Sequence, residues 1–292
     1  MAQVILIREF MSAFGGNELM FVFLMAGWLL GIAGGAGRIS SFFHNSPSKS
    51  AGLFLIAGLL LPALFIAAHL IRLWLGIPSG QIVDAIFAGG LSALFAVPLS
   101  MVYGAIFTAL SRASGHGQEG KEKDIGGLYA IEALGFVVGG ILLTGFLWIS
   151  MGAVTIILML TLCHLVWGTW ILGLRSVGLI FVLAGLMLLA MGVPGKLGEV
   201  LSKLQWPGFK VMESRDSVFG RVTVVERSGQ VSLFENGIFA YSTGDQMTAE
   251  ESVHYALLAH ALPKRDLLIG GGPGVISEAL QYLNVRGDYV EM

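Results

Sequence analysis

Long apolar runs constrain this chain more than any other feature of its sequence. Most of them reach the ~20 residues that a helix needs to cross the hydrocarbon core of a bilayer. A backbone in lipid must satisfy its own hydrogen bonds, so such runs are expected to be helical. The sequence therefore predicts a transmembrane domain over residues 1–193, with six spans and a short apolar segment before them at Ala2–Phe14. The six runs are Leu19–Ala36, Ala51–Gly76, Ile82–Leu110, Gly126–Ile149, Met151–Leu172 and Val177–Val193.

Composition agrees with a membrane domain followed by a soluble part. Hydrophobic residues make up 55% of the chain and charged residues only 12%, against roughly 25% charged in a typical soluble domain. Residues 1–193 carry 8 Lys+Arg and 7 Asp+Glu, whereas residues 194–292 carry 9 and 12 in half the length. The second part is mildly acidic and has no basic patch, which argues against a nucleic-acid partner. Cys163 is the only cysteine, so no internal disulfide or cysteine-based metal site can form.

The soluble part is predicted to begin with a linker and a small β-domain. Pro194-Gly195 and Pro207-Gly208 are turn signals, and we interpret residues 194–212 as a linker. Residues 213–245 contain short β segments separated by two-residue hairpin turns at Ser228-Gly229 and Asn236-Gly237. The three segments are Arg221–Glu226, Gln230–Glu235 and Ile238–Tyr241.

Residues 246–292 are predicted to form the start of an α/β Rossmann-like domain of the methyltransferase type. Thr248 and Glu251 have the spacing of a capping box at the start of a helix. A short apolar strand at Asp266–Ile269 runs into a glycine-rich turn, and a second helix is expected from about Val275 to Leu283. Tyr289-Val290 then begins another strand.

The glycine-rich turn Gly270–Gly274 is the most informative local motif. A strand, a glycine turn and a helix allow close approach of the backbone to a ligand, and the helix start offers free N–H groups. Glu291 ends the next strand, 17 residues past Gly274, where an acidic side chain can accept hydrogen bonds from ribose hydroxyls. The alternative is a tight strand-to-helix turn that binds nothing.

Other polar residues in the sequence indicate packing rather than a metal site. Asp84 lies near the end of a span and is expected to be solvated, whereas Glu132 is one turn inside its span and fits either a polar contact or a site. His69 and His164 have no partner at metal-ligand spacing, and His254 lies on a different helix face from His260. No metal site is predicted.

Taken together, the C-terminal segments resemble the spermidine synthase (polyamine aminopropyltransferase) family in its membrane-fused form. Arg8-Glu9, Phe14–Leu19 and Gly127–Ala130 with Gly135 are similar to the hydrophobic half of such fusions. The C-terminal segments that carry the resemblance are Phe219–Val222, Gln230–Gly237, Glu250–His254, Leu267–Gly274 and Tyr289–Glu291.

The resemblance implies transfer of an aminopropyl group from decarboxylated S-adenosylmethionine, a co-substrate rather than a tightly bound cofactor, to a diamine such as putrescine. Gly270, Gly272 and Gly274 would line the nucleoside, and Glu291 would bind its ribose. The catalytic acidic residues of the family would lie beyond Met292, so the chain is expected to be truncated within this domain, and no catalytic residue is named. Ala2–Phe14 would be the tail of a first span.

Several departures from the family pattern keep two other functions open. Pro273 stands where the family usually has an aspartate that helps hold the aminopropyl ammonium. The usual Tyr-His before the helix glutamate is replaced by Thr248-Ala249 or Ala249-Glu250. Pro273 favours an S-adenosylmethionine-dependent methyltransferase-like enzyme as one alternative. A transporter-like membrane protein with a non-catalytic sensing domain is the other. The expected partners are the lipid bilayer, a small amine substrate and, as a possibility, a second copy in a homodimer.

The orientation in the membrane raises a conflict. Basic residues gather in the two longer connections between spans, which places those connections in the cytoplasm. Alternation then puts the chain after Val193 outside, although a domain that uses a cytoplasmic nucleoside belongs inside. We predict a multi-pass cell-membrane protein whose C-terminal domain is cytoplasmic, so Val177–Val193 would not cross fully or Ile82–Leu110 would not be a simple span. The basic residues are Arg38, Lys49, Arg112, Lys121 and Lys123.

Overall fold

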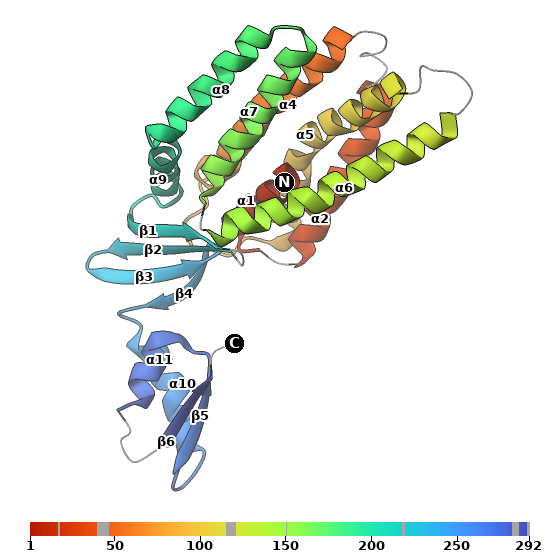
Figure 1. Ribbon diagram of the computed structural model, residues 1–292. Helices are drawn as coiled ribbons and strands as arrows, with labels where there is room; N and C mark the ends of the chain where they lie inside the picture. The colour runs from red at the N-terminus through yellow and green to blue at the C-terminus, as the bar shows by residue number, and fades with distance from the viewer. Residues whose placement is uncertain are drawn as a thin grey trace.

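The computed structural model describes residues 1–16, 18–39, 47–114, 121–149, 151–217, 220–281 and 286–290. Three parts follow one another along the chain: a helical bundle, a four-stranded sheet beneath it, and a unit of two helices and two strands at the end farthest from the bundle (Figure 1). The helices up to the sheet are α1 (Ala2–Phe14), α2 (Glu18–Gly34) with the π-helical turn η1 (Gly35–Ile39), α4 (Pro47–Trp74), α5 (Ala85–Ser114), α6 (Lys121–Trp148), α7 (Ala153–Ile171), α8 (Arg175–Ala190) and α9 (Val193–Gln205).

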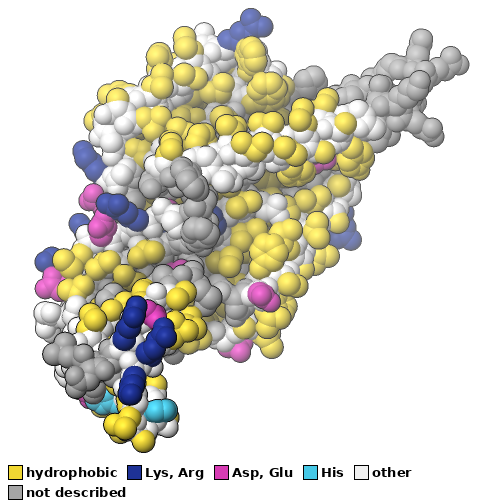
Figure 2. All heavy atoms as spheres, turned by 60° about the horizontal axis from the view of Figure 1, so that its bottom comes forward, with side chains coloured by type: hydrophobic (Ala, Val, Ile, Leu, Met, Phe, Trp, Pro, Cys, Tyr) yellow, Lys and Arg dark blue, Asp and Glu magenta, His cyan; other side chains and the backbone are white. Residues whose placement is uncertain are grey.

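Each apolar run of the sequence is a helix. Five of the described helices are long and apolar enough to cross a membrane, and the bent pair α8–α9 brings the number to six if it counts as one span. Exposed hydrophobic side chains cover most of the helical surface seen in Figure 2, which suits contact with lipid. The short segment Ala2–Phe14 is the most enclosed of these helices, with Ile5, Leu6 and Phe10 each only 1% exposed.

Glycines let α2 and α5 pack closely. A Cβ added at Gly27 would lie 2.5 Å from the Ala93 carbonyl oxygen, and one added at Gly35 would lie 1.9 Å from that of Met101. These positions need glycine because the two backbones touch there. The sequence pairs Gly34-Gly35 and Gly139-Gly140 both suit close helix packing. Gly35 packs in this way, whereas no described heavy atom lies within 4 Å of a Cβ added at Gly140.

The sheet is antiparallel, in the order β1-β2-β3-β4. Both predicted hairpin turns are present, since Ser228 and Gly229 have φ of 52° and 82°, and Asn236 and Gly237 have 49° and 78°. Two successive residues with positive φ define the type I′ turn, which matches the twist of a hairpin. The strands are β1 (Lys210–Asp216), β2 (Arg221–Arg227), β3 (Gln230–Glu235) and β4 (Ile238–Ser242).

The segment 194–212, interpreted as a linker from its turn residues, is mostly helical in the structure. Pro194 lies in the first turn of α9, where the missing N–H of proline costs no helical hydrogen bond. Gly208, with φ of 83°, forms the turn between α9 and β1. The chain therefore passes from the bundle into the sheet through a helix, a tight turn and an edge strand. Turn residues alone do not reveal whether they bound a loop or a helix.

The C-terminal unit contains α10 (Gln246–Leu258), β5 (Arg265–Ile269), α11 (Gly272–Ala279) and β6 (Arg286–Val290). β5 and β6 are parallel, so β5, α11 and β6 form a β-α-β unit. The capping box at Thr248 is wrong, because the helix begins earlier. Asp245 is the N-cap residue, and its carboxylate accepts a hydrogen bond from the Thr248 N–H at 3.3 Å. Helix α11 also begins and ends a few residues before the predicted one.

Candidate functional site

The glycine turn adopts a backbone conformation that requires glycine. Gly270, Gly271 and Gly272 have φ of 68°, 90° and 68°, in the left-handed region that side chains disfavour. Among the described residues, no heavy atom lies within 4 Å of a Cβ added at Gly270 or Gly272, so this part of the structure leaves the turn open on that side. Helix α11 begins here with Gly271 as its N-cap residue, which leaves the first N–H groups of the helix without helical partners. A ligand can therefore approach the backbone closely.

The other two predicted site residues, Gly274 and Glu291, are less clearly part of a ligand site. Gly274 lies in the first turn of α11, where a Cβ would come within 2.7 Å of the Tyr241 ring, so this glycine permits close packing against β4. Glu291 lies outside the described residues. The Gly270 N–H donates a hydrogen bond to the Val290 carbonyl at 2.9 Å, which holds the end of β6 next to the glycine turn. The nucleoside-binding roles of these residues stay predictions.

The two C-terminal helices are joined by a polar contact. His254 on α10 lies 2.9 Å from a Glu278 carboxylate oxygen on α11, and Gln281 donates to the other oxygen of the same carboxylate at 2.9 Å. Glu278 is buried, so this contact fixes the position of α11 against α10. Within the part of the chain that the structure describes, no group of three His, Cys, Asp or Glu side chains could hold a metal ion.

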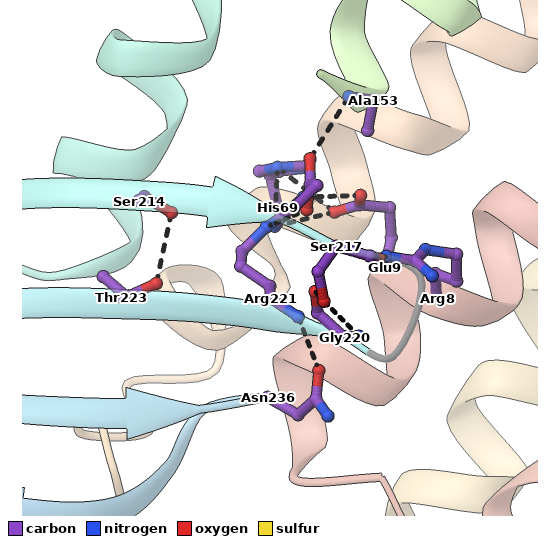
Figure 3. A network of polar contacts seen from close by, with 11 residues as sticks. Arg8, Glu9, His69, Ala153, Ser214, Ser217, Gly220, Arg221, Thr223 and Asn236 are labelled. Carbon is purple, nitrogen blue, oxygen red and sulfur yellow. Dashed lines mark hydrogen bonds and ion pairs between the residues drawn. The ribbon is translucent and has the colours of Figure 1, made fainter. Parts of the chain in front are cut away.

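A second polar site lies where the sheet meets the bundle, and the sequence did not predict it (Figure 3). Arg221, the first residue of β2, extends its guanidinium into the bundle and donates to both carboxylate oxygens of Glu9 on α1, at 3.1 and 2.7 Å. Its Nε donates to Asp216 on β1 at 2.9 Å. His69 on α4 lies 3.2 Å from Glu9. These four residues, called the junction cluster below, join two helices of the bundle to two strands.

The junction cluster is almost entirely removed from solvent. The side chains of Glu9, His69 and Arg221 are 2%, 4% and 9% exposed, and that of Asp216 is 13% exposed. The neighbouring guanidinium of Arg8 donates to the Ser217 carbonyl and brings a second positive charge. Two carboxylates thus face two guanidiniums. Burial of these charges is tolerated because each is paired and hydrogen-bonded.

The protonation of the sheet residues follows from their partners. Burial alone raises the pKa of the Asp216 carboxyl, but the charge and hydrogen bond of Arg221, the N–H of Ala153 and the charge of Arg8 together lower it below its usual value. Burial alone lowers the pKa of Arg221, and the charges and hydrogen bonds of Glu9 and Asp216 raise it above its usual value. Both groups are therefore charged at neutral pH.

Acid is expected to weaken the junction through Asp216. A carboxyl whose folded-state pKa is depressed stabilises the fold fully above its unfolded pKa of about 3.9, and this contribution is lost as the pH falls through the lower folded value. The stability of the wild-type chain should therefore fall below pH ~4 more steeply than that of an Asp216→Asn variant. Thermal unfolding in detergent between neutral pH and acid would measure the difference. Equal slopes for the two proteins would contradict this account.

A cavity of about 750 Å³ opens beside the junction cluster. It lies between the start of α7, the small-residue face of α9 and strand β1, with His69, Asp216 and Arg221 in its wall. The Ala153 N–H at the start of α7 donates to Asp216 at 3.2 Å, so this carboxylate also caps that helix. The residues of α9 that line the cavity are Pro194, Gly195, Gly198, Glu199, Ser202 and Lys203.

Sequence reasoning missed the junction cluster because its members are far apart in the chain. Arg221 and Glu9 are separated by 212 positions. Each was noticed only as part of a motif of the resemblance. His164 was expected to be a satisfied packing residue, and it bonds Tyr103 at 3.1 Å. His69 was expected to be the same, and it bonds the Phe65 carbonyl at 3.1 Å, but it also belongs to the junction cluster. The sign that could have pointed to Glu9 is an Arg-Glu pair inside an apolar segment.

Comparison with known proteins supports the resemblance over part of the chain. The polyamine aminopropyltransferase of Leptospira interrogans serogroup Icterohaemorrhagiae serovar copenhageni (strain Fiocruz L1-130) is 34% identical over 127 residues, which cover 41% of this chain and 26% of that protein. The chain thus spans about a quarter of the length of the curated relative that it matches. No family model and no solved structure matches the chain. The similarity shows a spermidine synthase-like relationship.

Proposed function

We propose that the protein is a membrane-anchored aminopropyltransferase, which transfers the aminopropyl group of decarboxylated S-adenosylmethionine to a small diamine such as putrescine. The observation that carries this proposal is the 34% identity to a polyamine aminopropyltransferase. The open glycine turn between β5 and α11 adds to it, because a nucleoside can reach the backbone there. The β-α-β unit would be the start of a Rossmann-like domain.

Ligand binding separates this proposal from its alternatives. Calorimetry in detergent on a full-length version with the complete soluble domain would compare decarboxylated S-adenosylmethionine with S-adenosylmethionine. Preference for the decarboxylated form supports the aminopropyltransferase. Preference for the carboxylated form supports a methyltransferase-like enzyme, which Pro273 in the glycine turn favours. Absence of binding to either would leave a transporter-like protein with a sensing domain.

Replacing Glu291 tests the nucleoside site directly. If this carboxylate binds a ribose, Glu291→Ala in a full-length version should weaken nucleoside binding by roughly 1.5–3 kcal/mol, the scale of a hydrogen bond to a charged group. Asp288 provides a matched control, because it is an exposed acid on the same strand whose partner is Arg265 at 3.4 Å. Asp288→Ala should leave the affinity unchanged. Equal losses for the two variants would mean that Glu291 is an ordinary surface acid.

The membrane anchoring rests on the apolar helices, and its orientation is part of the proposal. Arg38, Arg112 and Arg175 lie at the ends of helices away from the sheet, which favours that end as the cytoplasmic one. However, Lys196 and Lys203 follow directly on α8 at the sheet end, within the 15–20 residues that count toward orientation. The charge difference between the two ends is therefore smaller than the connections alone indicated. We place the sheet end in the cytoplasm, where nucleoside donors are made.

A reporter fusion tests this orientation. A reporter joined after Phe209, in the turn between α9 and β1, should be active only if it is of the type that works in the cytoplasm. A second fusion in the connection between α7 and α8, next to Gly173, should give the opposite result, because that connection lies at the other end of the bundle (Figure 1). Activity of an extracytoplasmic reporter after Phe209 would overturn the orientation and, with it, the access to a cytoplasmic donor.

A further inference from the structure

Helix α9 leaves the bundle at a sharp angle. It follows α8 after a break of two residues, and the two helices are bent by 66° relative to one another. Gly192, with φ of 65°, makes the bend possible. A helix that turns away from a membrane span at such an angle runs closer to the plane of the bilayer than to its normal. With 13 residues, α9 is about 20 Å long.

The surface of α9 is divided into distinct faces. Pro194 and Leu201 are buried against the bundle. Gly195, Gly198 and Ser202 line the junction cavity. Opposite the cavity side lies a stripe of large apolar residues that no part of the described structure covers: Leu197, Val200 and Leu204 are 39%, 51% and 41% exposed. Their spacing of three and four residues places them on one helix face.

In the chain, the stripe comes after the exposed apolar surface of α8, and two lysines border it. Exposed leucines of α8, such as Leu183 and Leu186 at 57% each, form the surface that precedes it along the chain. Lys196 and Lys203 are exposed and seven residues apart, so they share a helix face next to that of Val200, and Lys203 also stands at the edge of the junction cavity. Lysine side chains at such a border can extend from apolar surroundings to lipid phosphates.

We propose that α9 is an interfacial helix that lies on an anionic bilayer surface, with Leu197, Val200 and Leu204 in the boundary of the acyl chains and Lys196 and Lys203 against the phosphate groups. The occupant of the stripe is lipid because the stripe follows within a few residues on α8, whose exposed apolar surface suits lipid, and because the bordering charges are positive. The bilayer then covers one side of α9, while the other side forms the wall of the junction cavity. This assignment does not depend on the transferase reaction.

Site-directed spin labelling of the full chain in lipid nanodiscs tests the assignment. In a Cys163→Ala background, single cysteines replace either Val200 or Glu199, which is its neighbour in the chain but points about 100° away around the helix. The Val200→Cys label should collide more often with oxygen, which concentrates in the acyl region, than with a water-soluble nickel chelate. The Glu199→Cys label should show the reverse. Both positions are exposed in the protein, so neither label needs to displace packed side chains.

The lysines are tested by lipid composition. Addition of phosphatidylglycerol to phosphatidylcholine discs should shift the Val200→Cys label deeper, and Lys196→Gln with Lys203→Gln should abolish this dependence. Each lysine near an anionic surface is expected to change the partition of the helix by about fivefold. Nickel access to both labels would overturn the proposal. So would protection of position 200 that appears only with two copies per disc and is accompanied by spin–spin coupling, because a second chain would then cover the stripe.

Discussion

Replacement of Arg221 by methionine is expected to destabilise the folded protein by about 3–5 kcal/mol, the cost of removing one partner of a buried ion pair. Arg221 is the cation between Glu9 and Asp216, and the side chains of both carboxylates are at most 13% exposed. Without this guanidinium, the two buried carboxylates would have only the half-buried Arg8 as a neighbouring cation. Scanning fluorimetry of the chain in detergent would measure the loss, together with faster proteolysis at the start of β1.

Two further variants show whether charge is the cause. Lys210→Met removes an exposed pair with Glu226, in which the lysine side chain is 75% exposed, and should cost no more than about 1 kcal/mol. A triple variant that adds Glu9→Gln and Asp216→Asn to Arg221→Met removes both buried carboxylates, while the half-buried Arg8 keeps its hydrogen bond to the Ser217 carbonyl, and it should recover much of the stability. If the triple variant were less stable than Arg221→Met alone, packing of the arginine stem rather than its charge would explain the effect.

The helices and hairpins could be predicted because their causes are local. An apolar run of the right length becomes a helix whether or not its neighbours are known. The turns at Ser228-Gly229 and Asn236-Gly237 need residues that tolerate positive φ, and the sequence shows them. Local signals failed at α9, where Pro194 and Gly195 suggested a linker, and at Thr248, where Asp245 forms the cap instead.

The same difference between local and long-range causes separates the two candidate sites. The glycine turn was predictable because three consecutive glycines indicate a backbone with positive φ. Gly270, Gly271 and Gly272 adopt this conformation. The packing of Gly274 against Tyr241 was not predictable, since it depends on how β4 lies against α11. The junction cluster was equally hidden. It exists only because α1 and α4 place Glu9 and His69 under the inner end of β2, and no pattern in the sequence encodes that placement.

The C-terminal unit has few contacts of its own to stabilise it. A doubly wound nucleoside-binding sheet has about six strands, and the described part of residues 246–292 contains the two parallel strands β5 and β6. Leu267 and Ile269 on β5 are 61% and 57% exposed, although such strands are normally buried on both faces. Among the described residues of this unit, the apolar cluster buried between α10 and α11 is small and consists of Ala249, Val253 and Val275.

Residues 194–292 alone are therefore expected not to fold cooperatively. A two-stranded sheet is marginal in water, and the burial in this unit is too small to offset ~1–2 kcal/mol of backbone entropy for each ordered residue. The isolated segment also loses Glu9 and His69, so Arg221 would keep only Asp216 as a partner. The hairpins between β2 and β4 should persist locally, whereas the glycine turn should be mobile and bind no nucleoside measurably. Calorimetry and amide NMR spectra of the segment, compared with thermal unfolding of the full chain, would check this. A cooperative transition together with dispersed signals for Gly270–Gly274 would show that the C-terminal unit is a self-sufficient domain and does not need the bundle to hold it.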